Sequence, residues 1–503
     1  MNLNENLKNT ATRFPNRTAY TFLSQSKTYE ELNKLVDCAA SGLSAKGIRK
    51  GDRVALLLGN CPEFVIAYYG ILRAGAVVVP INPAYTSGEI SYILSNSQAK
   101  AVIAHSSLEP TISTLREKLE HLKLIFYTDS IDSEWTWEQL IQETEDTFES
   151  TSINEDDLAV ILYTSGTTGK PKGAMLSHRN MASNIASMSQ LAEFTEEDRI
   201  IAVLPMFHVF CMATCINIPI SCGAAIVIVP KFSPTEVINT IRREKATIFA
   251  GVPTMFSFLL QVPGATAGDF STIRACFSGG ASIPVELLNR FEEKYKVHVL
   301  EGYGLSETAP VTAFNPLRGI RKPGSVGVDI PEVKNKVVDP NGMEVSRGEI
   351  GELIVKGPNV MMGYLGMPEA TSSALKEGWF YTGDLARMDE EGYIYIVDRK
   401  KDMILVGGYN VYPREVEEVL YQHPAILETA VIGIPDKEYG EIVKAFVVTN
   451  GEGITMDDIL YFCEDKLAKY KLPKQVEFME ELPKNSTGKI LRRALRMEKV
   501  EVN

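Results

Sequence analysis

Residues 163–173 read YTSGTTGKPKG, at the end of the apolar run LAVILYT. The stretch contains three glycines, four Ser or Thr hydroxyls and two lysines. Glycines let backbone N–H groups approach an anion closely, and hydroxyls add hydrogen-bond donors. This composition predicts a cradle for phosphate, whereas Ser/Thr/Gly clusters without a ligand are ordinary surface loops. It is not the common nucleotide loop, because Thr164 replaces the first glycine and Pro171 follows Lys170 where Ser or Thr is required.

Five unusual loops follow apolar runs of this kind. SGTTGKPKG follows LAVILYT, MFHVF follows IIAVLP, VPT follows ATIFAG, SGGAS follows IRACF, and EGYGLSE follows VHVL. Ligands bind at the carboxyl ends of strands in parallel α/β sheets. We therefore expect the five loops to face one crevice, although each alone has the composition of a turn.

Short β-branched runs alternate with amphipathic stretches along much of the chain, which predicts parallel sheets covered by helices. Strands are expected in RVALLLGN, AVVVPINP and KAVIAH, and again in IIAVLP, AAIVIVP, ATIFAGVP, STIRACFSGG and VHVLEGYG. Helices are expected in PEFVIAYYGILRAG, SGEISYILSNS, PTEVINTIRREK and PVELLNRFEEKY. The two series predict an α/β fold with two stacked α/β layers in a large N-terminal domain.

After about residue 310 the texture changes, because Gly and Pro become dense and strands such as GELIVKG and GYIYIVD are expected to be antiparallel. This predicts a small β-barrel subdomain. The charged, glycine-bearing stretch VDRKKDMILVGGYN is a candidate linker. We therefore expect an N-terminal domain at 1–398, a hinge at 399–403 and a small, mobile α+β C-terminal domain at 404–503.

The bulk composition excludes some partners. Lys plus Arg is 51 and Asp plus Glu is 64, a formal net charge of −13, so nucleic-acid binding is not expected. The cysteine count is seven with no CxxC, which favours free thiols in the cytoplasm. Residues 200–229 carry no formal charge, but Pro205 and Pro219 interrupt them, so a buried strand, helix and strand are expected rather than a membrane span.

A set of motifs resembles a known superfamily. YTSGTTGKPKG, SGGA, EGYGLSE, YTGD, DRKKDMILVGGYNVYP and PKNSTGK occur in the order typical of the adenylate-forming enzymes, and the resemblance spans nearly the whole chain. EGWFYTGDLARMDEEGYIYIVDRKKDMILVGGYNVYPREVE most resembles bacterial medium- and long-chain fatty-acyl-CoA synthetases. The resemblance implies an acid–thiol ligase: a carboxylate and MgATP give acyl-AMP and pyrophosphate, and CoA then gives the thioester and AMP.

The resemblance also implies the ATP contacts. The opening loop holds the β- and γ-phosphates through Thr164, Ser165, Gly166, Thr167, Thr168, Gly169 and Lys172. Thr164 and Glu307 match the positions associated with Mg²⁺, which takes oxygen ligands; a carboxylate after Ser306 is also common at a helix N-terminus. The adenine pocket is expected from Gly279, Gly280, Ala281, Glu301, Gly302, Tyr303, Gly304 and Ser306.

Further roles are implied in the second half of the chain. Asp384 and Arg399 match contacts to the ribose, although a turn aspartate and a linker ion pair are the ordinary alternatives. Lys489, in PKNSTGK, matches the catalytic lysine of adenylation, carried on a domain that closes over the site as a lid. Lys401 matches the hinge and is also counted among the ATP contacts. Gly407 and Gly408 match the CoA tunnel.

The acid is expected to lie near Phe207, His208 and Gly251. The loops MFHVFCMATC and GVPTMF offer no formal countercharge for a second polar group, so a straight-chain fatty acid is expected. A peripheral membrane contact would serve its collection. An aryl- or short-chain-acyl-CoA ligase and a non-catalytic nucleotide or acyl sensor remain alternatives. Amino-acid activators need a carboxylate where His208 stands, and some long-chain members carry a tryptophan gate where Tyr409 and Asn410 stand.

Overall fold

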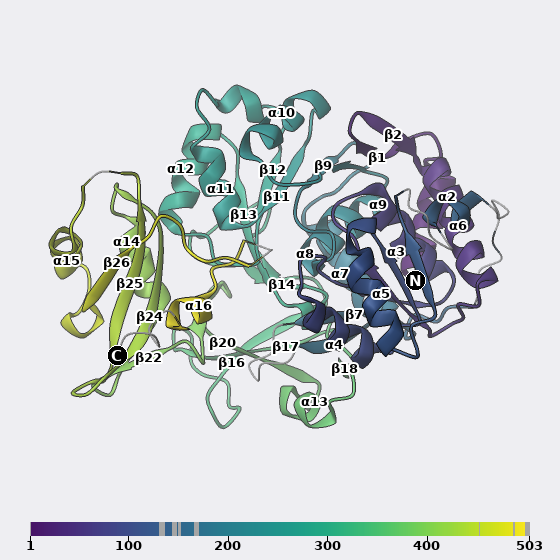
Figure 1. The fold of residues 1–503 in the computed structure, drawn as a ribbon. Coiled ribbons are helices and arrows are strands. Elements are labelled where there is room, and N and C mark those ends of the chain that lie inside the picture. Colours follow the sequence, from purple (N-terminus) through teal and green to yellow (C-terminus); the bar gives the residue numbers. More distant parts are fainter. Residues whose placement is uncertain are drawn as a thin grey trace.

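The computed structural model describes residues 2–129, 136–142, 148, 152–164, 171–451, 453–485 and 488–497. Figure 1 shows a large N-terminal part and a smaller C-terminal part beside it. Among the described residues, no helix is both long and apolar enough to cross a membrane.

A nine-stranded sheet positions four of the five loops. Its order is β15-β14-β13-β12-β11-β9-β10-β1-β2, and β13, β12, β11 and β9 are parallel neighbours. Their carboxyl ends therefore lie at one edge, as predicted. The bounds are β1 (Thr18–Phe22), β2 (Gln25–Thr28), β9 (Arg199–Ala202), β10 (Ala225–Ile228), β11 (Ile248–Gly251), β12 (Ala275–Ser278), β13 (Val299–Gly304), β14 (Val311–Phe314) and β15 (Val328–Asp329).

A second, seven-stranded sheet carries the fifth loop. Its order is β18-β8-β7-β4-β3-β5-β6, with the strands from β7 to β6 parallel. One continuous core joins the two sheets and includes Leu56 and Val160 of this sheet with Ile201 and Phe249 of the first. The bounds are β3 (Arg53–Leu57), β4 (Val77–Pro80), β5 (Ala101–Ala104), β6 (Leu124–Tyr127), β7 (Leu158–Thr164), β8 (Lys172–Ser177) and β18 (Gly363–Tyr364).

Helices begin where the sequence supplies caps. Thr28 and Glu31 form a capping box at α2, as Thr86 and Glu89 do at α4, and proline occupies the first turn of α3, α10 and α11. The N-terminal helices are α1 (Leu3–Arg13), α2 (Tyr29–Ala45), α3 (Pro62–Arg73), α4 (Ser87–Ser97), α5 (Glu109–Lys118), α6 (Trp137–Gln142), α7 (His178–Leu191), α10 (Pro234–Glu244), α11 (Pro253–Leu260), α12 (Val285–Tyr295) and α13 (Pro368–Ala374).

The uncharged run at 200–229 is a buried strand, helical segment and strand, as predicted. Between β9 and β10 the chain forms α8 (Val209–Cys211), a π-helical turn (Met212–Asn217) and α9 (Ile218–Cys222). The apolar side chains of this segment therefore belong to the core rather than to a membrane span.

The remaining sheets are small. The expected antiparallel strands form a five-stranded sheet of β16 (Lys334–Val338), β17 (Gly351–Lys356), β19 (Leu375–Lys376), β20 (Trp379–Met388) and β21 (Ile394–Arg399). A separate C-terminal sheet contains β22 (Ile404–Val406), β23 (Tyr409–Val411), β24 (Ile426–Asp436), β25 (Gly440–Thr449) and β26 (Gln475–Phe478), with α14 (Pro413–Tyr421), α15 (Met456–Glu464) and α16 (Arg492–Met497). We call this unit, from Ile404 on, the C-terminal domain.

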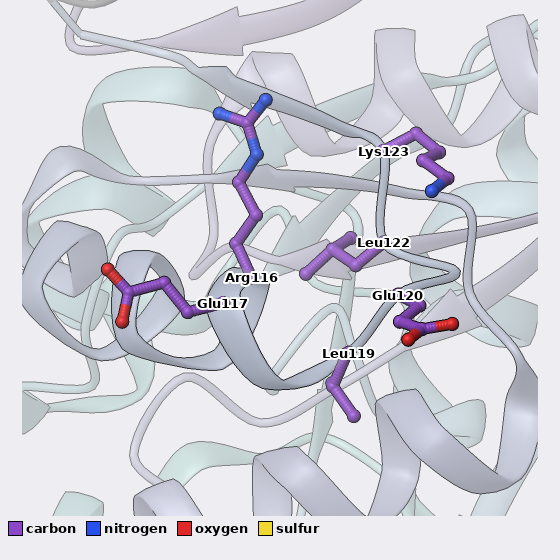
Figure 2. A pocket seen from close by; sticks show the side chains of 6 residues that line it. All are labelled: Arg116, Glu117, Leu119, Glu120, Leu122 and Lys123. Carbon is purple, nitrogen blue, oxygen red and sulfur yellow. The ribbon is translucent and has the colours of Figure 1, made fainter.

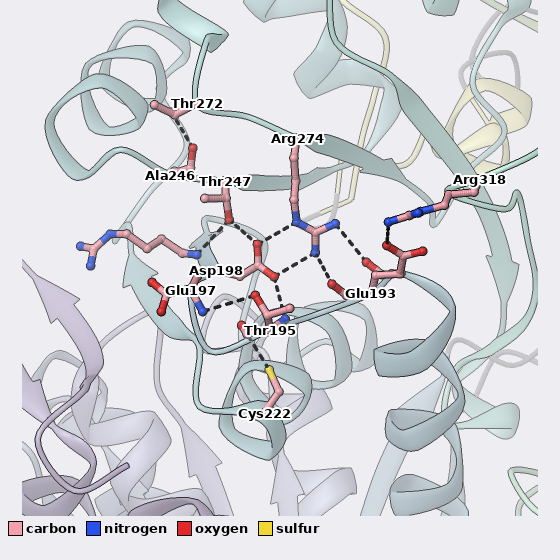
Figure 3. A network of polar contacts seen from close by, with 12 residues as sticks. Glu193, Thr195, Glu197, Asp198, Cys222, Ala246, Thr247, Thr272, Arg274 and Arg318 are labelled. Atoms are coloured by element: carbon pink, nitrogen blue, oxygen red, sulfur yellow. Dashed lines mark hydrogen bonds and ion pairs between the residues drawn. The ribbon is translucent and has the colours of Figure 1, made fainter. Parts of the chain in front are cut away.

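A polar network joins the amino ends of the first sheet's parallel strands (Figure 3). Arg274, before β12, donates from Nε and Nη2 to the two carboxylate oxygens of Asp198, before β9, at 2.8 and 2.9 Å. Thr247, before β11, donates to Asp198 Oδ1 at 2.7 Å. The network therefore holds the strands together at the end opposite the predicted crevice.

We expect Arg274→Met to destabilise the fold, because it leaves the buried Asp198 carboxylate without a countercharge. The loss should be on the order of 3 kcal/mol, visible as a lower thermal midpoint. Arg318→Met is the matched control, because Arg318 is an exposed partner of Glu193 at the margin of the same network and such pairs contribute little. Equal shifts in the two variants would contradict this assignment.

Candidate active site

The carboxyl ends of the two large sheets meet at Glu307. Thr164, the last residue of β7, donates from Oγ1 to Glu307 Oε1 at 3.4 Å. Glu307 lies in a single turn of 3-10 helix (Ser306–Thr308) just after β13 and is buried. The pair predicted for Mg²⁺ is thus brought together from two different sheets. The rest of the opening loop, residues 165–170, lies outside the described residues.

Tyr364 completes this group and was missed in the sequence. Its hydroxyl donates to Glu307 Oε1 at 2.9 Å, and Lys172 Nζ lies 5.1 Å from its ring centroid. Burial, with the charge of Glu307, raises the pKa of Tyr364 well above its usual value, so the hydroxyl remains a donor. The strand β18, which contains Tyr364, has only two residues and forms the edge of the sheet by pairing with β8. So short a strand has no detectable periodicity.

The oxygen donors fit Mg²⁺. A threonine hydroxyl and a carboxylate are the hard ligands that this ion prefers, and it keeps its other positions for phosphates and water. In the described part of the chain, no group of three or more His, Cys, Asp or Glu side chains could hold a metal. A magnesium ion at Thr164 and Glu307 would therefore depend on the substrate's oxygens.

The predicted ribose contacts are assembled around one carboxylate. Asp384, in β20, is buried, and its Oδ2 accepts a 2.5 Å hydrogen bond from the Tyr303 hydroxyl. Arg399 Nε lies 3.4 Å from Asp384 Oδ1, because the two residues are paired across β20 and β21. Burial raises the pKa of Asp384, whereas Arg399 and the Tyr303 hydrogen bond lower it. The carboxylate, the guanidinium and the phenol thus hold one another in place.

Two different physical causes explain why glycine stands at positions of the expected adenine pocket. Gly280 has φ +79°, a conformation that favours glycine, and a Cβ there would lie 3.5 Å from Lys489 Cε. A Cβ at Gly279 would lie 3.3 Å from the Phe210 ring. At Gly302 and Gly304 a Cβ would collide with β14 or the residue before it, at 2.6 Å and 2.1 Å. Packing of β13 therefore requires these last two glycines whether or not a ligand is bound.

Glu301 interacts with the C-terminal domain. Its side chain is buried, Oε1 accepts from the Ile283 N–H at 3.2 Å, and Oε2 has no hydrogen-bond partner among the described residues. Burial raises the pKa of Glu301 to about 7, against the opposing effect of Arg414 in α14. This expected ATP contact thus has protein partners in the structure, namely the Ile283 N–H and the charge of Arg414.

The expected acyl-binding residues follow β9 and β11. His208 Nδ1 accepts from the Phe210 N–H at 3.3 Å, which leaves its Nε2 as the N–H of the neutral ring. Burial, together with Lys489, lowers the pKa of His208 to about 3, so the ring is uncharged near neutral pH. Phe207 is half-buried, and a Cβ at Gly251 would lie 3.0 Å from the Phe249 ring. These residues provide an uncharged surface.

Asn60 positions the MFH loop and was also missed in the sequence. Its Oδ1 accepts from the Met206 N–H at 2.9 Å, and its Nδ2 donates to the carbonyls of Leu204 at 2.9 Å and Val229 at 3.1 Å. Asn60 follows β3 of the second sheet, whereas its partners follow β9 and β10 of the first. One buried amide thus fixes the loop across both sheets.

Lys489 reaches this site from the C-terminal domain. It is partly buried, and the preceding Gly488 accepts a 3.4 Å hydrogen bond from Thr254 of α11. Burial and the nearby Arg399 lower the pKa of Lys489 to about 8, whereas Asp384 and Glu307 act to raise it. The predicted catalytic lysine therefore shares one electrostatic environment with the predicted metal and ribose ligands.

The expected hinge and CoA residues lie elsewhere in the C-terminal domain or at its border. Lys401 is exposed in the turn between β21 and β22. Gly407 (φ +57°) and Gly408 (φ +89°) form the turn between β22 and β23, and Gly407 N–H donates to Tyr439 O at 2.7 Å. The positive φ angles explain both glycines through the turn itself.

A surface depression of about 430 Å³ lies near the amino end of β6. The loops of the candidate active site follow the carboxyl ends of strands instead. Figure 2 shows that the charged side chains of the depression, Arg116, Glu117, Glu120 and Lys123, point in different directions. It lacks the convergent polar groups of the site at Glu307 and Lys489.

Solved structures match this arrangement closely. The ATP-bound crystal structure of MatB from Rhodopseudomonas palustris is 36% identical and has a TM-score of 0.92, covering 99% of this chain and 98% of that one. The apo crystal structure of the same protein has a TM-score of 0.82 over the same shares. The anthranilate CoA ligase AuaEII in complex with anthranoyl-AMP is 31% identical, with a TM-score of 0.93 over 99% and 96%. Over the whole chain, the present structure is thus more similar to the ATP-bound structure of MatB than to the apo structure.

Sequence relatives cover the whole chain. A long-chain-fatty-acid–CoA ligase of Bacillus subtilis (strain 168) is 40% identical over 98% of this chain and 94% of the relative. The model of the AMP-binding enzyme C-terminal domain matches residues 415–489. The model of the AMP-binding enzyme itself matches residues 7–365, the part that supplies Thr164 and Glu307. The chain therefore belongs to the AMP-binding enzyme family, and the motif resemblance is confirmed.

Proposed function

We propose that this protein activates a medium- to long-chain fatty acid with ATP, forming acyl-AMP and pyrophosphate, and then transfers the acyl group to CoA. The observation that carries the proposal is the convergence of Thr164, Glu307, Asp384, Arg399 and Lys489 from three sheets and a C-terminal loop. A non-catalytic sensor would have no need for a lysine placed among these charges.

We propose a task for each residue. Adenylation brings an anionic carboxylate against the α-phosphate, so the site must offset their repulsion. Lys489 supplies a positive charge from the C-terminal domain, and Asp384 and Arg399 hold the ribose. When bound, Mg²⁺ would neutralise phosphate oxygens as a Lewis acid. Thr164 and Glu307 would hold it, with Tyr364 orienting the carboxylate of Glu307.

We favour a fatty acid as the substrate because the side chains expected around the acyl group carry no formal charge. His208 is neutral, and the helical segment behind it, from Val209 to Ile220, is almost entirely apolar and buried. The name of the Bacillus subtilis relative supports the same class. An aryl acid is the second candidate, favoured by the similarity to AuaEII with anthranoyl-AMP.

Two orientations of the C-terminal domain would serve the two half-reactions. We place the hinge at 399–403, with Lys401 at its centre, and the CoA tunnel beside Gly407 and Gly408. In support, each described hydrophobic cluster lies wholly before residue 397 or wholly after residue 403. A rotation at 399–403 would expose no shared core. The seven free cysteines support a cytoplasmic location, where a peripheral membrane contact would give access to fatty acids.

The pH dependence of adenylation should follow Lys489. Its pKa is lowered to about 8, so the ammonium is present below that pH and is lost as pH rises through it. The value of kcat/KM for pyrophosphate exchange reports the pKa values of groups in the free enzyme. It should therefore fall about tenfold per pH unit above the pKa of Lys489. The variant Lys489→Arg keeps its positive charge at high pH, so this decrease in kcat/KM should disappear. A rate that stays flat to pH 9.5 in the wild type would contradict this role.

The hinge is tested by Lys401→Pro, which fixes φ and restricts the preceding residue. Adenylation should persist while CoA transfer collapses. Lys489→Ala should show the reverse pattern, losing on the order of 10²–10³-fold in adenylation but far less in thioester formation from supplied acyl-AMP. Rapid quench of each half-reaction measures both. Normal thioester formation by Lys401→Pro would place the hinge elsewhere.

The substrate class is tested by kcat/KM for even-numbered saturated acids from acetate to palmitate, with benzoate and a cinnamate alongside. Each buried methylene should add about 0.8 kcal/mol, or roughly fourfold, until the tunnel ends. Specificity should therefore climb with chain length and then level off. A maximum at acetate or at an aromatic acid would refute the fatty-acid proposal and leave the adenylation chemistry standing.

A further inference from the structure

A contact between α14 and α12 joins the two domains (Figure 1). Glu418 of α14 accepts, through Oε2, a 3.2 Å hydrogen bond from the backbone N–H of Val285. Val285 is the first residue of α12, in the N-terminal domain, whereas Glu418 belongs to the C-terminal domain. The contact is partly buried.

Helix α12 lacks a cap of its own. Its N-cap residue is Pro284, which makes no side-chain cap hydrogen bond. The first N–H groups of a helix have no partner within the helix, and the helix dipole favours a negative charge beside them. Glu418 therefore supplies from the other domain what Thr28 supplies to α2 within its own segment.

Arg414 reinforces the same contact. Its Nη1 donates to the Ile396 carbonyl at 2.6 Å and its backbone N–H to Asp398 Oδ2 at 3.1 Å, so the first turn of α14 is attached to β21. Arg414 Nε lies 3.7 Å from Glu418 Oε1. The guanidinium also opposes the repulsion between Glu418 and the buried Glu301. Burial raises the pKa of Glu418, whereas Arg414 and the Val285 N–H lower it, so both contacts favour the charged carboxylate.

The contact restrains the domain that carries Lys489. Lys489 and Glu418 are carried by the same domain. Near Lys489 the domain border is crossed by Lys484 Nζ, which lies 5.4 Å from the Phe258 ring centroid, and by a 3.4 Å hydrogen bond from Thr254 to the Gly488 carbonyl. Such a long bond restrains orientation weakly. The charged contact at α12, together with Arg414, is the stronger restraint on the domain.

We infer that Glu418 is a positioning residue for adenylation: its carboxylate at the N-terminus of α12 holds the C-terminal domain in the orientation that places Lys489 over the site. The inference rests on the proposed two-orientation function. It adds that the same contact must break before CoA transfer, so its strength sets how the enzyme divides its time between the two half-reactions.

The test compares Glu418→Ala with Glu415→Ala. Glu415 lies on the same helix and pairs with Lys471 inside the C-terminal domain, so it controls for damage to α14. Glu418→Ala should slow single-turnover adenylation about tenfold, the scale of losing a hydrogen bond to a charged group. Thioester formation from supplied acyl-AMP should be unchanged or faster. Glu415→Ala should leave both rates near the wild type.

Val285→Pro tests the other partner without touching the charge. It removes the N–H, while proline is favoured at the first helical position and Pro284, with ψ 137°, tolerates a following proline. It should reproduce the selective loss of adenylation, and the double variant should be no slower than Glu418→Ala alone. Equal loss in both half-reactions, or additive effects in the double variant, would overturn the inference while the proposed function stands. A wild type that forms no acyl-AMP from any acid would overturn both.

Discussion

The balance of charge around Lys489 is the interaction on which the other features depend. A lone ammonium in a partly buried position tends to lose its proton, and here Arg399 adds to that tendency. Asp384 and Glu307 oppose it, and they come from the small antiparallel sheet and from the end of β13. These charges therefore come together only where the three sheets and the C-terminal domain meet.

Much of this arrangement follows from local sequence. Apolar runs alternate with amphipathic stretches, so β9, β11, β12 and β13 were predicted with their loops on one edge, and the structure confirms it. The sequence pattern does not show that Thr164, from the other large sheet, meets Glu307. These residues are 143 positions apart, and the contact depends on how two sheets pack across a shared core. The motif resemblance, rather than the periodicity of the sequence, predicted that the two residues act at one site.

Other residues lay beyond sequence reasoning for identifiable reasons. Tyr364 sits on a two-residue strand whose existence depends on the free edge of β8. Asn60 bonds to four backbone groups at or just after the ends of β9 and β10. Every residue has such backbone groups, so the sequence cannot indicate these partners. Gly302 and Gly304 illustrate the reverse case, because close packing against the following chain already requires glycine there. A glycine in a ligand motif can thus have a purely structural cause.

The border between the domains is held by polar contacts rather than by a shared hydrophobic core. No described hydrophobic cluster includes residues from both sides, so separating the domains would expose little shared apolar surface. Polar contacts cross the border among the described residues: Glu418 with Val285 of α12, Arg414 with β21, and Thr254 with Gly488. Polar contacts of this kind exchange with water at modest net free energy, yet their geometry is directional. Such contacts are compatible with the two domain orientations proposed above, because they can specify one orientation without making it permanent.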